Sequence, residues 1–209
     1  MKSVLISTRP KWCELIASGE KTIEARKTAP KEVPFKGYIY PTRPKKYYKC
    51  GAVSTSDELL WLSNGKIKMC DGFELWANGE DYQCVNGKVI GEFICYNVDE
   101  YTFSYYNAEY RVTHVEQKAM CLNQPELILY GKGKTLYGWH ISDLKIYDKP
   151  REFSEFATLC NKSGNRCANC RHYLFDNDGL AGYRRWCDVC HRKPLARAPE
   201  SWCYVEVYK

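Results

Sequence analysis

The pattern of apolar and polar residues changes its period once between Pro10 and Arg26. The first part is typical of an amphipathic helix with three apolar side chains on one face: Trp12, Leu15 and Ile16. Pro10 suits the first helical position and Gly19 the position just past the end, so we expect the helix to stop there. Apolar and polar residues then alternate, which predicts a half-buried strand over 22–26.

This predicted strand collects polar side chains on one face. Ile23 and Ala25 alternate with polar neighbours, which places three polar residues opposite them: Thr22, Glu24 and Arg26. Lys21 lies in the turn just before the strand. So many polar groups exceed what a solvated edge needs, and the segment is therefore a candidate site. The alternative is a surface helix and an edge strand joined by Glu/Lys pairs.

Comparable patterns predict the other elements. Four turn dipeptides divide 50–87 into short segments typical of a hairpin insertion: Asn64-Gly65, Asp71-Gly72, Asn78-Gly79 and Asn86-Gly87. The segment Val89–Val98 is apolar on both faces, as in a central strand, and its Glu92 needs a partner such as Arg26 or Lys21. Three further elements are expected: helices over 114–122 and 124–130, and a strand over 136–147 that Pro150 ends.

Length and hydropathy limit the class of protein. At 209 residues the chain can hold one sizeable core and a small appended module. No apolar run approaches the ~20 residues that cross a bilayer, and the start, MKSVLIST, resembles a strand more than a signal peptide. We therefore expect a cytoplasmic protein without a membrane segment. A monomer is the default, since nothing in the sequence indicates an oligomer.

Basic residues concentrate at the start of the chain. The net charge is +6, but residues 1–50 carry twelve Lys or Arg against four Glu, a local charge of +8. In TRPKKYYK, Lys45 and Lys46 stand directly before Tyr47. Cations interleaved with aromatic rings suit a polyanion with stackable bases, such as RNA. A solvated loop is the alternative.

Four of the twelve cysteines have the spacing of a zinc site. They form two C-x2-C pairs, sixteen residues apart: Cys167, Cys170, Cys187 and Cys190. Two such pairs complete a tetrahedral shell without an open position, so we expect a structural zinc. Cys160 and His191 are alternative ligands. Haem attachment at the CDVCH string is disfavoured because it needs an exported protein, and a redox pair because no βαβ pattern surrounds the thiols.

The segment Gly19–Arg26, GEKTIEAR, resembles the G-x-K-x-x-E-x-R signature of the ASCH family in the PUA-like superfamily. Other segments resemble strands of that fold: Ser3–Ser7, Gly37–Tyr40, Gly87–Val98 and Tyr137–Tyr147. With its end, RAPESWCYVEVYK, the whole chain is similar to small ASCH proteins of Gram-positive bacteria and their prophages.

The resemblance implies an α+β fold that is mainly β. A PUA-like barrel with a few short helices would span 1–150, with the hairpin insertion at about 50–87. A small zinc-binding module would span 151–209, and its C-terminal tail would pack back on the barrel.

Members of the superfamily bind RNA or nucleotides in a cleft beside the motif, so the resemblance implies an RNA-binding or nucleotide-binding protein. Lys21 and Arg26 would pair with phosphate, Arg26 as a bidentate fork, while Glu24 would accept hydrogen bonds from a base edge or hold Arg26. The other candidate contacts are basic or aromatic: Arg9, Lys11, Trp12, Tyr40, Lys45, Lys46, Tyr47 and His140.

Two other functions are consistent with the resemblance. Some ASCH proteins resemble hydrolases of modified nucleosides that use a lysine, a threonine and a glutamate, but Glu24 stands where those enzymes have the threonine. Thr22 is a candidate substitute for the hydroxyl and Glu92 for the carboxylate, and Lys21, Glu24 and His140 are candidates for ribonuclease chemistry. The prophage-like resemblance alone favours a host-interaction or anti-defence protein.

Overall fold

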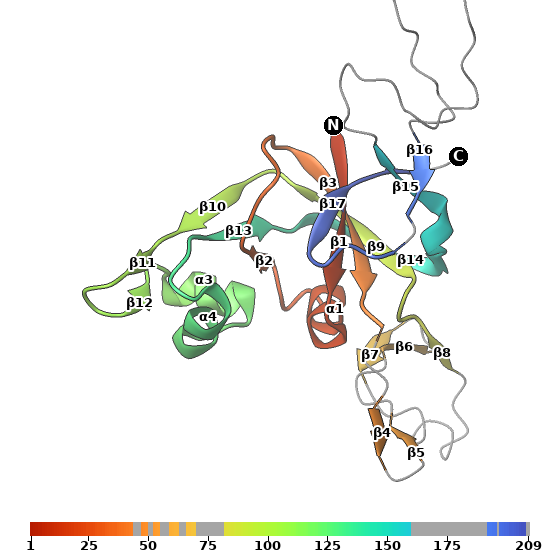
Figure 1. The fold of residues 1–209 in the computed structure, drawn as a ribbon, viewed down its shortest axis with the longest axis horizontal. Coiled ribbons are helices and arrows are strands. Elements are labelled where there is room, and N and C mark those ends of the chain that lie inside the picture. Colours follow the sequence, from red (N-terminus) through yellow and green to blue (C-terminus); the bar gives the residue numbers. More distant parts are fainter. Residues whose placement is uncertain are drawn as a thin grey trace, which may run out of the picture.

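The computed structural model describes residues 1–43, 47–49, 52–54, 59–62, 66–69, 82–159, 192–195 and 197–207. Within these ranges two sheets carry the fold (Figure 1). The larger sheet has the order β14-β9-β3-β1-β17 and is formed by β1 (Lys2–Thr8), β3 (Phe35–Pro41), β9 (Val89–Cys95), β14 (Ser142–Arg151) and β17 (Trp202–Tyr204). In it β1 and β3 run parallel, and the other neighbours are antiparallel.

The second sheet is antiparallel and has the order β10-β13-β2, from β10 (Val98–Tyr101), β13 (Leu136–His140) and β2 (Ile23–Arg26). Smaller pieces complete the described strands: β4 (Tyr47–Lys49) with β5 (Ala52–Ser54); β6 (Leu59–Leu62) with β7 (Ile67–Met69) and β8 (Tyr82–Cys84); β11 (Phe103–Ser104) with β12 (Glu109–Tyr110); and β15 (Phe156–Leu159) with β16 (Arg192–Pro194) and β18 (Glu206–Val207). The predicted mainly β class is thereby confirmed.

Three short α-helices lie in the described part: α1 (Pro10–Ala17), α3 (His114–Met120) and α4 (Gln124–Gly131). Capping boxes begin α3 and α4, where Thr113 and Asn123 each accept the N–H of a glutamate that bonds back to the cap. These bonds satisfy N–H groups that have no partner inside the helix. As predicted, Pro10 starts α1 and Gly19 follows its end, with a φ of 80° that favours glycine. None of these helices is long and apolar enough to cross a membrane.

Apolar layers cover both faces of the larger sheet. On one face Phe35 packs edge-on against Trp139 of β13, with ring centroids 5.0 Å apart, which joins the two sheets. On the opposite face Tyr38 contacts Phe156 in the same way, at 5.0 Å. A third cluster lies under β2, β10 and β13, where α3 and α4 pack. The strand face of Ile23 and Ala25 is buried in this third cluster.

Three details differ from the sequence prediction. The strand expected over 136–147 is two strands in different sheets, β13 and β14, because the chain leaves one sheet at Ile141 and Asp143 takes a left-handed φ of 48°. Pro150 does not end β14, which continues to Arg151. In α1 the buried line runs through Cys13 and Ile16, so that Trp12 and Leu15 are only half-buried.

Several predictions concern residues outside the described ranges. They include three of the four turn dipeptides and the zinc motif with its alternatives: Cys160, Cys167, Cys170, Cys187, Cys190 and His191. The division into a barrel over 1–150 and a zinc module over 151–209 therefore stays a prediction. Within the described part, β17 pairs with β1, and β18 pairs with β15.

Candidate functional site

A cleft of about 860 Å³ lies between the end of β1, the start of α1, strand β2 and helix α4. Its lining includes five residues that the sequence analysis selected: Arg9, Trp12, Lys21, Glu24 and Arg26. Further lining residues come from distant parts of the chain: Ser7, Thr8, Ala25, Lys27, Thr28, Thr42, Leu122, Glu126, Leu129, Tyr130, Glu200 and Ser201.

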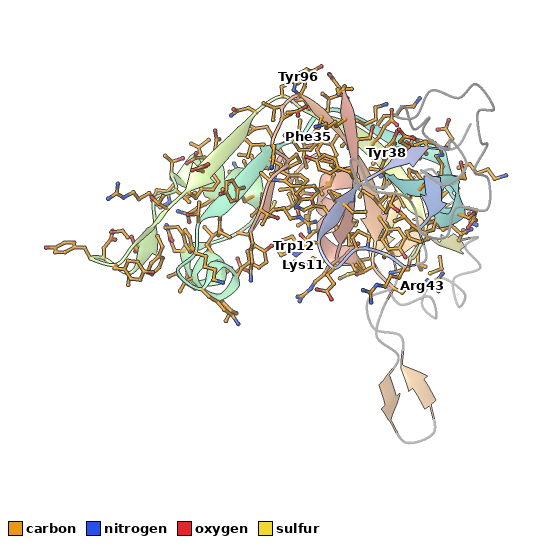
Figure 2. All side chains as sticks on the ribbon, turned by 45° about the horizontal axis from the view of Figure 1, so that its top comes forward. Lys11, Trp12, Phe35, Tyr38, Arg43 and Tyr96 are labelled. Atoms are coloured by element: carbon orange, nitrogen blue, oxygen red, sulfur yellow. The ribbon has the colours of Figure 1, made fainter. Side chains whose placement is uncertain are left out.

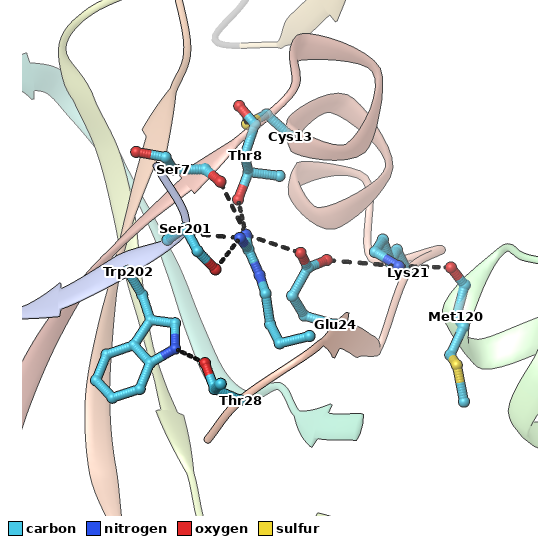
Figure 3. Close-up of polar contacts among 10 residues, drawn as sticks. Ser7, Thr8, Cys13, Lys21, Glu24, Thr28, Met120, Ser201 and Trp202 are labelled. Atoms are coloured by element: carbon cyan, nitrogen blue, oxygen red, sulfur yellow. Dashed lines mark hydrogen bonds and ion pairs between the residues drawn. The ribbon is translucent and has the colours of Figure 1, made fainter. Parts of the chain in front are cut away.

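A chain of buried charges forms one wall of the cleft (Figure 3). The Glu24 carboxylate lies between two cations: its Oε1 is 2.9 Å from Arg26 Nη2, and its Oε2 is 3.5 Å from Lys21 Nζ. All three residues are almost wholly buried, with exposed fractions of 2% for Lys21, 5% for Glu24 and 6% for Arg26. Strand β2 is therefore buried on both faces, and the prediction of a half-buried strand was wrong. We call these three residues the charged wall.

Arg26 connects the charged wall to two other segments. Its Nη2 donates to the Ser7 carbonyl and to Thr8 Oγ1, both at 2.9 Å, at the end of β1. Its Nη1 donates to the carbonyl and the hydroxyl of Ser201, at 3.2 and 3.3 Å. These contacts and Glu24 engage both Nη groups of the guanidinium. Arg26 thus holds Glu24, and this pairing is one of the two roles considered for Glu24.

Lys21 is fixed by the ends of two helices. Its backbone N–H donates to the Leu15 carbonyl in the last turn of α1, at 2.9 Å. Its Nζ donates to the Met120 carbonyl at the end of α3, at 2.5 Å. A helix C-terminus has unpaired carbonyls and favours a cation, so this contact stabilises both α3 and the ammonium group. Lys21 therefore reaches the cleft from a defined position.

Two aromatic rings border the cleft, each with a cation near its face. Trp12, on α1, has Lys21 Nζ at 5.1 Å and Lys11 Nζ at 4.7 Å from the ring centroid, and Figure 2 shows Lys11 beside it. Tyr130, on α4, has Lys27 Nζ at 4.9 Å. Burial raises the pKa of Tyr130, so its phenol is neutral at physiological pH. Neutral rings with adjacent cations are suited to stack on a base next to a phosphate.

The charges of the lining nearly balance. Four are basic and three acidic: Arg9, Lys21, Arg26 and Lys27 against Glu24, Glu126 and Glu200. Arg9 and Lys27 are exposed at the rim. Among the described residues, Arg9 forms neither an ion pair nor a side-chain hydrogen bond, and the Lys27 ammonium contacts only the Tyr130 ring. These two cations are therefore available to an anionic ligand.

Unsatisfied polar atoms also lie beside the cleft. Arg26 Nε and Ser7 Oγ are buried and lack a hydrogen-bond partner in the part of the chain that the structure describes. Buried groups without partners are uncommon and are often found where function requires them. A thiol nucleophile is disfavoured nearby, because burial raises the pKa of Cys13 well above its ordinary value. The chemistry available to the cleft is thus that of hydroxyl, carboxylate and ammonium groups.

Two of the predicted catalytic residues, Thr22 and Glu92, lie away from the cleft lining. Thr22 is exposed just before β2, with its backbone bonded to Ala119 and Ile141. Glu92 pairs with Lys36 Nζ at 2.9 Å and with the Tyr147 hydroxyl at 2.6 Å, rather than with Lys21 or Arg26. The reason is that β9 neighbours β3 and β14, whereas β2 belongs to the other sheet.

His140 and Tyr40 also take other positions. His140 Nε2 is 2.6 Å from Asp99 Oδ2, on the neighbouring strand β10. Tyr40 is 5% exposed and packs against Phe153 with centroids 5.2 Å apart, so that stacking on a base is excluded for it. Tyr47 lies in β4, and Lys45 and Lys46 are outside the described residues.

Sequence reasoning missed the residues that complete the site. Ser7 and Thr8 end a strand that looked purely structural, and Ser201 is 175 positions from the arginine it binds. Tyr130 was assigned to a helix without a role. Its sequence context, an aromatic residue directly before a glycine that ends a helix, does not by itself indicate a binding site.

No protein family model matches the chain, and a search of curated proteins gives no match either. Among solved structures it is similar to ASCH from Zymomonas mobilis, with 18% identity and a TM-score of 0.41, covering 72% of this chain and 73% of that one. A serine-to-alanine mutant of that protein gives 17% identity and a TM-score of 0.42, covering 72% and 74%. A tyrosine-to-phenylalanine mutant gives 16% and 0.36, covering 73% and 76%. Because these sequence identities and TM-scores are low, the function has to be inferred from the cleft itself.

Proposed function

We propose that the cleft binds one nucleotide unit of a nucleic acid, with RNA as the preferred class. The observation that supports this most is the charged wall: the chain buries Lys21, Glu24 and Arg26 beside an open cleft bordered by Trp12 and Tyr130. Buried charges cost desolvation free energy, which apolar residues of the same size would avoid. Retaining them next to a cleft is typical of a binding or catalytic site.

Each group has a role in this proposal. Arg9 and Lys27 at the rim pair with phosphate, which supplies most of the affinity and its salt dependence. Trp12 and Tyr130 stack on the base. Glu24, held between two cations, accepts hydrogen bonds from amino groups on a base edge. Arg26 is a positioning residue for Glu24 and does not contact the ligand.

The experiment compares binding of short single-stranded RNA by the wild type and by rim variants. Arg9→Ala with Lys27→Ala should weaken binding at least tenfold and reduce the slope of log affinity against log salt by about 1.4, the value for two lost phosphate contacts on a single strand. Trp12→Leu should weaken binding without changing that slope. Lys149→Ala removes an exposed lysine elsewhere and serves as the control. Wild-type affinity in both test variants would contradict the proposal.

A hydrolase of modified nucleosides is the second candidate. The observation that favours it is that the cleft lining includes a lysine, a carboxylate and a threonine, with Thr8 in the role for which Thr22 was a candidate. In such a reaction water would add across an amide bond of the nucleoside to give an acid and an amine. We would incubate a panel of acylated nucleosides with the wild type, Thr8→Val and Lys21→Met. Turnover by the wild type but not by the variants supports hydrolysis, whereas intact nucleosides throughout would leave binding as the function.

A further inference from the structure

Two highly exposed tyrosines, Tyr105 and Tyr106, lie at the tip of the β11–β12 hairpin. Tyr105 is 82% exposed and Tyr106 is 102% exposed, values far above those of other described aromatic side chains. The hairpin projects from the lobe that carries α3 and α4, at the far left of Figure 1. Aromatic rings are costly to leave in water, and two together on one turn are typical of a contact surface.

The hairpin is attached firmly to α4. Gln124, in the first turn of α4, accepts from the Tyr110 N–H at 3.1 Å and donates to the Tyr110 carbonyl at 2.7 Å. The Tyr110 hydroxyl donates to the Lys134 carbonyl at 2.7 Å. It also packs so closely on Gly131 that a Cβ there would collide with it. The tip is therefore held in place relative to the helix, as a binding surface requires.

Basic residues surround this tip. Tyr105 packs edge-on against Phe103 with centroids 5.1 Å apart, and its hydroxyl lies 3.4 Å from the Gly133 carbonyl. Gly133 stands between Lys132 and Lys134, whose side chains are exposed. The opposing charge on the hairpin is Glu109, and exposed Arg111 stands two positions after it. The tip thus combines two ring faces with an excess of positive charge.

The basic turn also continues from the cleft. Leu129 and Tyr130, in the last turn of α4, line the cleft, and Lys132 follows after one residue. Lys132 and Lys134 therefore follow the cleft-lining ring of Tyr130 closely along the chain, and the carbonyl of Gly133 between them lies 3.4 Å from the Tyr105 hydroxyl. A turn with two exposed lysines thus links the end of the cleft to the hairpin tip.

We propose that the hairpin tip, comprising Tyr105, Tyr106, Lys132 and Lys134, is a second contact surface for a single-stranded nucleic acid whose neighbouring nucleotide occupies the cleft. This inference rests on the proposed function and makes the ligand an oligonucleotide rather than a free nucleotide. Single strands are favoured over duplexes because exposed rings stack on unpaired bases. A protein interface is typically depleted of lysine, whereas two of these four side chains are exposed lysines, which favours a polyanion as the ligand.

The experiment measures affinity for oligouridylates of about 4 and about 16 nucleotides, the two ends of the site sizes known for single-strand binding folds. The wild type should bind the longer one more tightly. Tyr105→Leu and Tyr106→Leu should each weaken binding of the longer oligonucleotide by about 5-fold to 150-fold, the effect of one lost stacking contact, and leave binding of the shorter one unchanged. Tyr106→Phe keeps the ring and should bind as the wild type does. Tyr96→Leu is the matched control, since Tyr96 is 56% exposed but lies after β9.

The two proposals fail differently. Trp12→Leu changes the cleft and should weaken binding of both oligonucleotides. If the cleft binds RNA without help from the hairpin, both tyrosine variants will bind the longer oligonucleotide with wild-type affinity. That result would overturn the second surface alone. Equal weakening of both lengths by Tyr106→Leu would overturn it too, and would indicate another role for the hairpin. A wild type that binds neither length overturns both proposals.

Discussion

The Arg26 guanidinium and the Glu24 carboxylate lie 2.9 Å apart on one face of β2, and both are almost wholly buried. Residues two positions apart on a strand share a face, so the pair forms without a distant partner. The guanidinium also forms hydrogen bonds with residues of other segments: Ser7 and Thr8 of β1, and Ser201 just before β17. Arg26 thus joins three segments that are far apart in the sequence.

Replacing Arg26 should therefore destabilise the protein strongly. Arg26→Met leaves Glu24 and four carbonyl or hydroxyl groups without the donor that Arg26 supplies. Breaking a buried pair costs about 3 to 5 kcal/mol in the free energy of unfolding. Arg26→Lys keeps the charge but loses the planar fork, so an intermediate loss is expected. Urea denaturation measures both. Arg111→Met, at an exposed arginine, should change the stability by no more than about 0.5 kcal/mol. A similar effect from both methionine variants would contradict this role for Arg26.

Glu92 makes the stability depend on pH. Burial acts to raise the pKa of Glu92, but hydrogen bonds from Tyr147 and Lys36 outweigh it and lower the pKa below the ordinary value of 4.5. A carboxylate with a lowered pKa stabilises the fold above its ordinary pKa, and this contribution is lost as the pH falls through the folded-state value. Glu92→Gln should thus reduce the free energy of unfolding by about 1 to 3 kcal/mol at pH 7 and much less near pH 3.

The matched variant for this pH effect is Tyr147→Phe, which removes one of the two donors to Glu92. It should lose part of the same pH-dependent stability. Thermal melts from pH 3 to pH 7 would follow both variants. A stability difference between Glu92→Gln and the wild type that is constant over this range would show that the carboxylate charge is not what stabilises the pair.

Local patterns predicted the elements that depend on local physics. Gly19 marked the end of α1 because a left-handed φ there favours glycine, and the alternation after it separated Ile23 and Ala25 from Glu24 and Arg26. Both predictions need only neighbours along the chain. They placed Glu24 and Arg26 correctly on one strand face, although they predicted that this face is exposed to solvent, whereas it is buried.

Predictions that depend on sheet order could not be made from local patterns. Nothing in the strand 89–95 says that its neighbours are β3 and β14, and so the partner of Glu92 was misjudged. Tyr40 was a candidate contact for a ligand because it is an aromatic residue just before the basic segment TRPKKYYK. In the structure the segment around β15 covers the sheet face that carries Tyr40, and the ring packs on Phe153. The sequence of a strand does not show which distant segment will pack on its outer face.

His140 is expected to matter for stability and not for ligand binding. It bonds Asp99 on the edge of the smaller sheet, and it is not part of the cleft lining. His140→Asn should reduce the free energy of unfolding by about 1 kcal/mol, because Asp99 loses one partner and keeps Asn97. Its affinity for short RNA should stay within twofold of the wild type. A tenfold loss of affinity in folded protein would instead make His140 a ligand contact.

The four-cysteine motif predicts one structural zinc ion per chain. Leu159 of β15 pairs with Arg192 of β16, so the segment that carries all four cysteines starts and ends at one place, which suits two C-x2-C pairs sharing one ion. In the part that the structure describes, no group of three or more His, Cys, Asp or Glu side chains could hold a metal. Because four cysteines complete one tetrahedral shell, metal analysis of protein purified without added zinc should return about one equivalent. Cys167→Ser with Cys187→Ser should abolish it, and a chelator should lower the melting temperature of the wild type only. Cys84→Ser, at an exposed free cysteine, should keep the full equivalent. A wild type without zinc that melts at the same temperature with and without chelator would end the zinc proposal.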